Sequence, residues 1–279
     1  MIKKAYVDTA GGQIHYRYCS EGTGSPLVFF HMTAASSEAY EGIMSVLDGK
    51  LPMIAFDTVN YGESFRTTRE PSIDYIADVM SEALTKLGID KFHSFGHHTG
   101  VSIAVEIAGK TPDRVLSVIM NGPTYATHEE MAYLMRKLAL PNPISIKGTQ
   151  FVWAWSRIKD NFPFSLWGDN ELQAAIMHRD TVDMLRAGTN WHWGYRAVFS
   201  HDLPAAVKKV RCPMFLVCGQ HDLSFPYHER MAADYPEVPS YVFADGGVYY
   251  IETHPEDLAP HLVDFIRGVQ QGLNHGERV

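Results

Sequence analysis

The chain has 279 residues, of which 46% are hydrophobic and 20% are charged. This balance is typical of a folded globular protein and excludes intrinsically disordered and collagen-like classes. The net charge of −8 argues against nucleic acid or an anionic membrane as the main partner. Three cysteines, odd in number and widely spaced, indicate neither a disulfide framework nor a cysteine metal site.

The composition also bears on where the protein works. Few and unpaired cysteines fit a reducing compartment, so we expect a cytoplasmic protein. The N-terminal sequence Met1-Ile2-Lys3-Lys4 lacks the apolar core of a signal peptide, and no apolar run reaches the ~20 residues that span a bilayer. We therefore expect no membrane association, and the sequence leaves homo-oligomerisation open.

The first 123 residues alternate strand-like and helix-like patterns. Short apolar runs have the length of buried strands, and the apolar residues of 73–87 recur at helical spacing before Gly88, a usual helix-ending residue. Such alternation with short connections predicts a mostly parallel sheet covered by helices on both faces. The elements expected here are strands at 26–30, 51–56, 91–95 and 115–120 and helices at 73–87 and 101–110.

The composition changes after Pro123, where tryptophans, methionines and helix-like segments become frequent. We expect a helical cap at 124–203, inserted between two parts of one α/β core at 1–123 and 204–279. The elements expected after the cap are strands at 213–218 and 240–243 and a helix at 258–269.

The segment Gly96-His97-His98-Thr99-Gly100 joins a predicted strand to a predicted helix. This is the layout of a nucleophile elbow, G-x-S-x-G, in which a sharp turn holds the central residue in a strained backbone at the start of a helix. The two glycines allow the turn and the close approach of the helix to the sheet. The central residue here is His98.

Four more segments follow the order found in one fold family. Phe30-His31-Met32-Thr33 is similar to a His-Gly-x oxyanion loop, and 57–64 is similar to a D-x-x-G-x-G-x-S turn. Residues 219–226 are similar to the segment with the triad acid. Gly246-Gly247-Val248, followed by His254-Pro255-Glu256, is similar to the segment with the triad histidine. The chain thus resembles the α/β-hydrolase family in its capped branch. That resemblance implies a mostly parallel sheet flanked by helices, with a helical cap inserted after the sixth strand.

The catalytic residues of the family transfer only in part. The triad acid maps to Asp222, but the nucleophile position holds His98 and the base position holds Val248. The glycine of the oxyanion loop is replaced by Met32. The resemblance therefore does not carry acyl transfer through a serine ester over to this chain.

Our main hypothesis is that the two triad departures compensate each other. An imidazole at position 98 reaches further than a serine hydroxyl, and Val248 leaves it room to extend towards Asp222. We predict a His98–Asp222 dyad in which the carboxylate fixes the tautomer and the second ring nitrogen acts as a general base in the pocket. The family's oxyanion donors map to the backbone N–H groups of Thr33 and Thr99.

Other histidines and the tryptophans rank lower as site residues. We expect His31 to bond local backbone and His97 to orient a loop or line the cap side. A metal site on His93, His97 and His98 is not expected, because no H-E-x-x-H or similar pattern is present. The candidates for lining the pocket are His31, Met32, His97, Trp191, Trp193 and Val248.

The five tryptophans Trp153, Trp155, Trp167, Trp191 and Trp193 all lie in the predicted cap and favour a small apolar or aromatic substrate. We expect a cofactor-independent enzyme, first a hydrolase of an ester, a lactone or a carbon–carbon bond. A lyase, a decarboxylase or a cofactor-free dioxygenase with the same dyad is the second hypothesis. The third is a ligand-binding protein that has lost catalysis, because a fold alone does not define a function.

Overall fold

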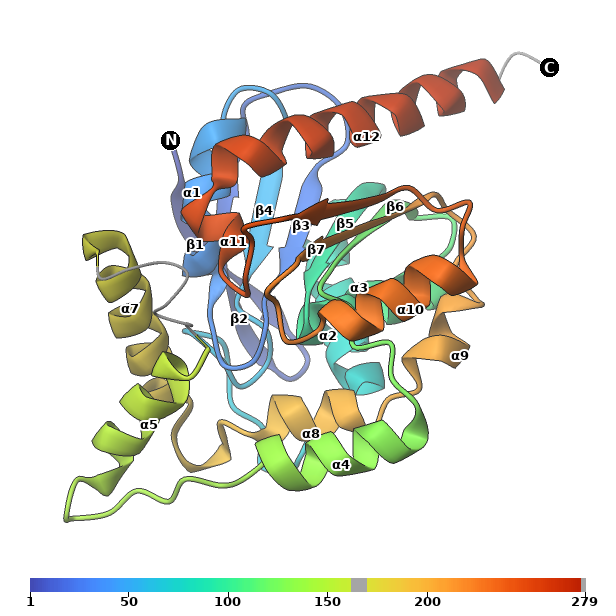
Figure 1. Ribbon diagram of the computed structural model, residues 1–279. Coiled ribbons are helices and arrows are strands. Elements are labelled where there is room, and N and C mark those ends of the chain that lie inside the picture. The colour runs from blue at the N-terminus through green and yellow to red at the C-terminus, as the bar shows by residue number, and fades with distance from the viewer. Residues whose placement is uncertain (162–169, 277–279) are drawn as a thin grey trace.

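The centre of the fold is a twisted sheet, seen in a computed structural model that describes residues 1–161 and 170–276 (Figure 1). Within these residues the sheet has eight strands in the order β1-β2-β4-β3-β5-β6-β7-β8. Strand β2 runs antiparallel to both of its neighbours, β1 and β4, and the remaining strand pairs are parallel. The strands are β1 Lys3–Thr9, β2 Gly12–Cys19, β3 Leu27–Phe30, β4 Met53–Phe56, β5 Phe92–His97, β6 Val115–Asn121, β7 Met214–Gly219 and β8 Ser240–Phe243.

Helices cover both faces of the sheet, as the alternating pattern predicts. One face packs against α1 (Glu41–Leu47), α11 (Tyr250–Thr253) and α12 (Pro255–Gly276). The other packs against α2 (Ile73–Lys86), α3 (Thr99–Lys110) and α10 (Phe225–Asp234). Strands β3 and β5 are buried along their whole length because helices lie on both sides of them.

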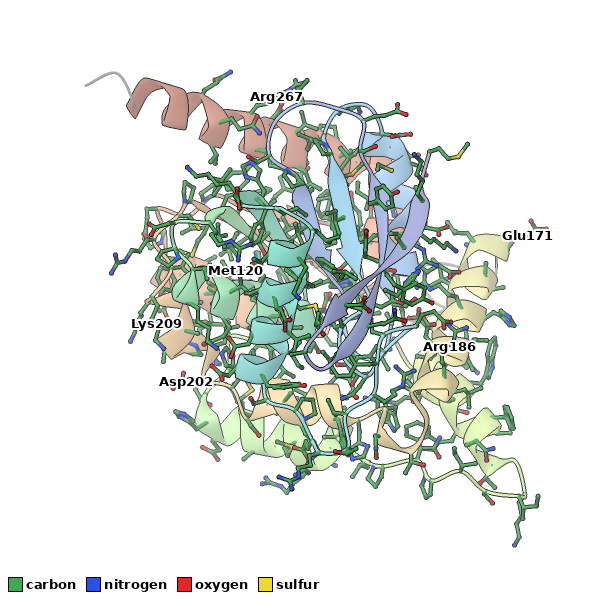
Figure 2. All side chains as sticks on the ribbon, turned by 180° about the vertical axis from the view of Figure 1, so that it is seen from behind. Met120, Glu171, Arg186, Asp202, Lys209 and Arg267 are labelled. Carbon is green, nitrogen blue, oxygen red and sulfur yellow. The ribbon has the colours of Figure 1, made fainter. Side chains whose placement is uncertain are left out.

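A helical insertion follows β6, which confirms the predicted position of the cap. In Figure 1 these helices lie below and beside the sheet. Figure 2 labels Glu171 and Arg186 near the two ends of α7. The Arg186 guanidinium lies 2.8 Å from a carboxylate oxygen of Glu63, a residue outside the insertion. The helices are α4 (His128–Leu138), α5 (Thr149–Lys159), α7 (Glu171–Ala187), η2 (Gly188–Asn190), α8 (Trp193–Phe199) and α9 (Leu203–Val207).

The limits of the cap at 124 and 203 stay a prediction. Helix α9 begins at Leu203, and its buried residues Leu203, Ala206 and Val207 pack into the core cluster of α2 and α3. Trp167 lies outside the described residues. No described helix is both long and apolar enough to cross a bilayer.

The structure adds elements for which the sequence patterns gave no prediction. The β1–β2 hairpin was missed because β1 is mostly exposed and lacks a regular alternation of apolar and polar residues. Helices α1, α10 and α11 are short and were also missed. Helix α12 extends past the predicted 258–269 at both ends.

Candidate active site

The turn between β5 and α3 has the geometry of an elbow. His98 has φ 47° and ψ −107°, a conformation that non-glycine residues rarely adopt. A β-carbon at Gly100 would collide with the carbonyl oxygen of Phe30, and one at Gly96 would collide with the backbone of Gly100. The two glycines therefore let α3 start directly against the sheet, as the motif predicts.

His98 and Asp222, 124 residues apart in sequence, are in hydrogen-bond contact. Nε2 of His98 lies 2.9 Å from Oδ2 and 3.0 Å from Oδ1 of Asp222. Asp222 follows β7 and is buried, and its Oδ1 also accepts hydrogen bonds from the amide and the hydroxyl of Ser224, both at 2.7 Å. Ser224 was not among the predicted site residues.

The environment of Asp222 favours its ionised form. Burial alone would raise the pKa of this carboxyl, but the His98 ring and the hydrogen bonds from Ser224 outweigh burial and hold the pKa well below its usual range. A carboxylate that stays ionised can orient an imidazole and stabilise its positive charge. The carboxylate contacts Nε2 of His98, and Nδ1 has no hydrogen-bond partner among residues 1–161 and 170–276.

A mostly apolar cavity of about 80 Å³ lies beside the His98 ring. The core contributes Met32, Thr99 and Val248 to its wall, so two predicted pocket residues and one predicted donor residue border it. The cap contributes apolar side chains from α4 and α8, namely Leu134, Leu138, Tyr195, Val198 and Phe199. Side chains of the core and of the cap therefore both border this cavity.

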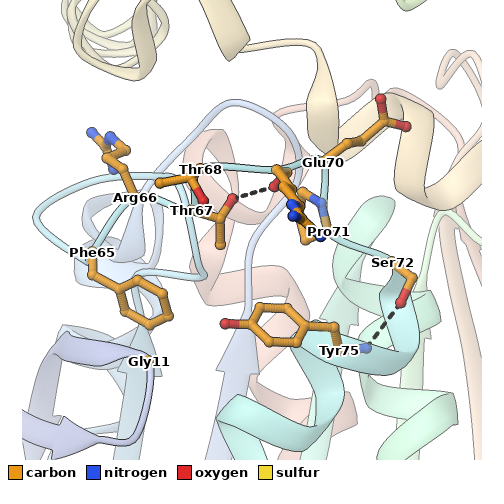
Figure 3. Close-up of a pocket in the computed structure, with 10 residues that line it drawn as sticks. Gly11, Phe65, Arg66, Thr67, Thr68, Glu70, Pro71, Ser72 and Tyr75 are labelled. Carbon is orange, nitrogen blue, oxygen red and sulfur yellow. Dashed lines mark hydrogen bonds between the residues drawn. The ribbon is translucent and has the colours of Figure 1, made fainter.

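A larger cavity, about 540 Å³, lies elsewhere on the surface, between the β1–β2 turn and α2 (Figure 3). Phe65 and Tyr75 form two of its walls, and Arg66 at its rim donates to the carbonyls of Ser64 and Gly62. Neither His98 nor Asp222 borders this cavity. The smaller cavity is therefore the better candidate for a reaction site, because it adjoins His98, which is paired with Asp222 in the predicted dyad.

The predicted oxyanion loop is held from two sides. Oγ1 of Thr33 lies 2.9 Å from Oγ1 of Thr99, so side chains of the two predicted donor residues are in contact. His31 accepts a hydrogen bond from the amide of Thr58 at 2.9 Å on Nε2, and its Nδ1 bonds the carbonyl of Met32 at 2.8 Å. His31 thus bonds local backbone as expected, and it does not border the cavity.

Tyr61 connects the core to the cap, a role that the sequence did not reveal. Its hydroxyl accepts a hydrogen bond from the amide of Gly194 at 2.7 Å and donates one to the carbonyl of Trp191 at 2.8 Å. A β-carbon at Gly194 would collide with Oγ1 of Thr33, so this part of the cap lies directly against the oxyanion loop.

Two tryptophans and His97 differ from the prediction that they line the pocket. Trp191 is fully buried inside the cap, with its ring 5.1 Å from that of Trp153 and 5.6 Å from that of Tyr195. Neither Trp191 nor Trp193 borders the cavity, and Tyr195 borders it instead. The large indole ring of Trp191 packs the cap helices together, which removes it from the site.

His97 is the last residue of β5, directly before the elbow residue His98, and is 2% exposed. Burial lowers the pKa of His97 to about 3, so its ring is neutral, and a hydrogen bond joins it to the backbone of Val248. Like the two tryptophans, His97 does not border the cavity.

Comparisons with known proteins agree with this topology. Residues 25–143 match the model of the alpha/beta hydrolase fold. A thermophilic esterase from Thermogutta terrifontis superposes with a TM-score of 0.76 at 18% identity, covering 96% of this chain and 99% of that one. The enol-lactonase from Burkholderia xenovorans LB400 superposes with a TM-score of 0.77 at 16% identity, covering 94% and 100%.

The sheet order, the elbow and the insertion after β6 define an α/β-hydrolase fold, and residues 25–143 are similar to the family model of that fold. Among curated proteins, the fluoroacetate dehalogenase of a Burkholderia species is 23% identical over 92% of this chain and 92% of its own length.

Proposed function

We propose that the protein is a hydrolase in which His98, oriented by Asp222, acts as a general base on water. The observation that carries this proposal is the 2.9 Å contact between Nε2 of His98 and Oδ2 of Asp222 beside a cavity. The relatives named as an esterase, an enol-lactonase and a dehalogenase support hydrolysis as the class of reaction.

The substrate class follows from the wall of the cavity. Apolar side chains from α4 and α8 face His98, and a volume of about 80 Å³ admits only a small reacting group. We propose a small apolar or aromatic ester or lactone, since such a compound combines a hydrophobic body with one polarised carbonyl. A ketone cleaved at a carbon–carbon bond meets the same requirements.

The proposed reaction has two steps. Nδ1 of His98 takes a proton from water while the oxygen attacks the carbonyl carbon, and the backbone amides of Thr33 and Thr99 stabilise the negative oxygen. The tetrahedral intermediate then releases the alcohol, which receives the proton from His98. Asp222 stays ionised throughout and stabilises the imidazolium.

Turnover of p-nitrophenyl acetate by the full chain tests this proposal. We expect His98→Ala to lower the rate by roughly 10²–10⁴-fold, as is usual for the loss of a general base. We expect His221→Ala to change it little, because His221 is exposed on the loop next to Asp222. A reagent that labels reactive serines should leave the wild type active.

Other outcomes would favour the alternative functions. Unchanged ester turnover in His98→Ala would exclude the proposed base. No ester turnover, with His98-dependent consumption of oxygen or release of carbon dioxide from a carbonyl compound, would indicate proton abstraction without hydrolysis. Thermal stabilisation by a ligand that is never converted, in both wild type and His98→Ala, would indicate a binding protein.

A further inference from the structure

We propose that His97, His98 and Asp222 form a binding site for a divalent transition-metal cation such as Zn²⁺. One ligand atom of each residue lies within 4.8 Å of the other two. This inference does not depend on hydrolysis, because it concerns which cation these three side chains hold.

His97 contributes a nitrogen lone pair that no group in the described part of the chain satisfies. The residue is 2% exposed, and its Nε2 is buried without a hydrogen-bond partner among the described residues. The ring also bonds the backbone of Val248, which fixes its orientation. A buried imidazole nitrogen in this state is ready to accept either a proton donor or a cation.

Asp222 and His98 supply the other two ligand atoms. Oδ1 of Asp222 is already bonded to the amide and hydroxyl of Ser224, whereas Oδ2 is hydrogen-bonded to Nε2 of His98 alone among the described residues. In the form in which Nδ1 acts as a base, Nε2 of His98 carries a hydrogen towards Asp222. Nε2 presents a lone pair beside the acceptor atoms of His97 and Asp222 once that hydrogen leaves it. A cation in place of that hydrogen would satisfy all three, with the His98 proton moving to Nδ1, so that the cation-bound form and the form in which Nδ1 acts as a base are alternative states of the same side chains.

The donor set suits zinc and similar ions. Two imidazoles and one carboxylate are a known combination for Zn²⁺ sites that keep a fourth position open, and hard cations such as Mg²⁺ prefer oxygen alone. Ligand atoms around tetrahedral zinc lie about 3.4 Å apart. The widest spacing, up to 4.8 Å, must therefore contract by up to about 1.4 Å, while the 2.9 Å between Nε2 of His98 and Oδ2 of Asp222 must widen by about 0.5 Å. The His98 side chain, 20% exposed at the cavity, is the one able to move.

The sequence did not predict this set. The sequence analysis considered a metal site on His93, His97 and His98 and did not expect one. In the structure Nδ1 of His93 lies 2.8 Å from Oγ of Ser117, which occupies that nitrogen. The carboxylate comes instead from Asp222, beyond the cap in sequence.

Titration of the chelator-treated full chain with CoCl₂ alone, followed by visible absorption, tests the site without any assay of activity. We expect one equivalent of Co²⁺ bound per chain and displaced by ZnCl₂. We expect His97→Gln and Asp222→Asn to weaken binding on the order of tenfold or more, and His221→Gln to leave it unchanged. Absence of binding at millimolar Co²⁺, or equal affinity in His97→Gln, would overturn the proposal.

A second measurement covers a variant that fails to fold. X-ray absorption at the zinc edge of the wild type counts imidazole ligands directly. We expect two imidazoles, and fewer than two would overturn the proposal. Because neither experiment uses ester turnover, loss of the metal site and loss of the proposed hydrolase activity are separate results.

Discussion

A β-carbon on Gly122 would lie 2.6 Å from Nε2 of His98, closer than real β-carbons approach any atom. Gly122 follows β6, has φ 63°, and donates its amide hydrogen to the carbonyl of Val217 at 2.9 Å. The ring of His98 therefore occupies space that only a glycine at position 122 leaves open. The contact between His98 and Asp222 depends on this glycine as much as on the elbow.

Gly122→Ala should therefore displace the His98 ring from Asp222. We expect ester turnover to fall on the order of 100-fold, and the free energy of unfolding to fall by about 1–3 kcal/mol from overlap and backbone strain. Kinetics and thermal unfolding measure both. In a His98→Ala background the same substitution should cost less stability, because the ring is absent, and only the strain at positive φ and the overlap with Oγ of Ser224 remain. Equal costs in both backgrounds would show that the ring does not need the glycine.

The double change His98→Ser with Val248→His should create serine esterase activity. Asp222 keeps its hydrogen bonds from Ser224 and remains available to orient a new histidine. We expect the double variant to hydrolyse p-nitrophenyl acetate and to be inactivated by a serine-directed reagent, unlike either single variant. A folded double variant without such activity would show that Met32 in the oxyanion loop prevents serine chemistry.

A buried charged cluster links the cap to the core. Arg179 of α7 forms ion pairs with its neighbour Asp180 and with Glu252 of α11, and Asp183 lies one turn further along α7. Asp183 and Glu252 are both buried. Burial raises the pKa of Asp183 to about 7, and burial, opposed by Arg179, raises the pKa of Glu252 to about 7.

Stability should therefore fall as pH rises from 5 to 8. Between about pH 4, the ordinary carboxyl pKa, and about pH 7, the raised pKa, the folded chain binds more protons than the unfolded chain. These two carboxyl groups therefore favour the folded state most at low pH, and the folded state loses this stability as the pH rises towards 7. The difference in stability between Asp183→Asn and wild type should therefore depend on pH. We expect this difference to shift in favour of the variant by about 1–3 kcal/mol from pH 5 to pH 8. Asp264→Asn, at an exposed position of α12, should show no such difference in thermal unfolding. An equal pH dependence in wild type and Asp183→Asn would contradict the raised pKa.

Tyr61→Phe should destabilise the junction of cap and core. The change leaves the amide of Gly194 and the carbonyl of Trp191 buried without the partner they have now. We expect a loss of about 1–3 kcal/mol, the usual effect of an unsatisfied buried group. Tyr6→Phe, at a half-exposed ring on the edge strand, is the matched control. Similar unfolding midpoints for Tyr61→Phe and wild type would mean that water replaces the hydroxyl.

Local patterns in the sequence were sufficient for the framework of this protein. Buried strands and amphipathic helices have periodicities set by their own backbone geometry, so β3 to β8, α2, α3 and the insertion after β6 could be predicted. The elbow could also be predicted, because the spacing of Gly96 and Gly100 is itself the local requirement. The same motifs placed His98 and Asp222 at positions that meet at one edge of the sheet.

Only the tertiary structure decided what surrounds these residues. The space left by Gly122, the hydrogen bonds of Ser224 to Asp222 and the unpartnered nitrogen of His97 all arise where segments far apart in sequence pack together. The inward packing of Trp191 has the same origin. Such contacts depend on the relative positions of whole elements to within about an ångström, and no local pattern of residues carries that information.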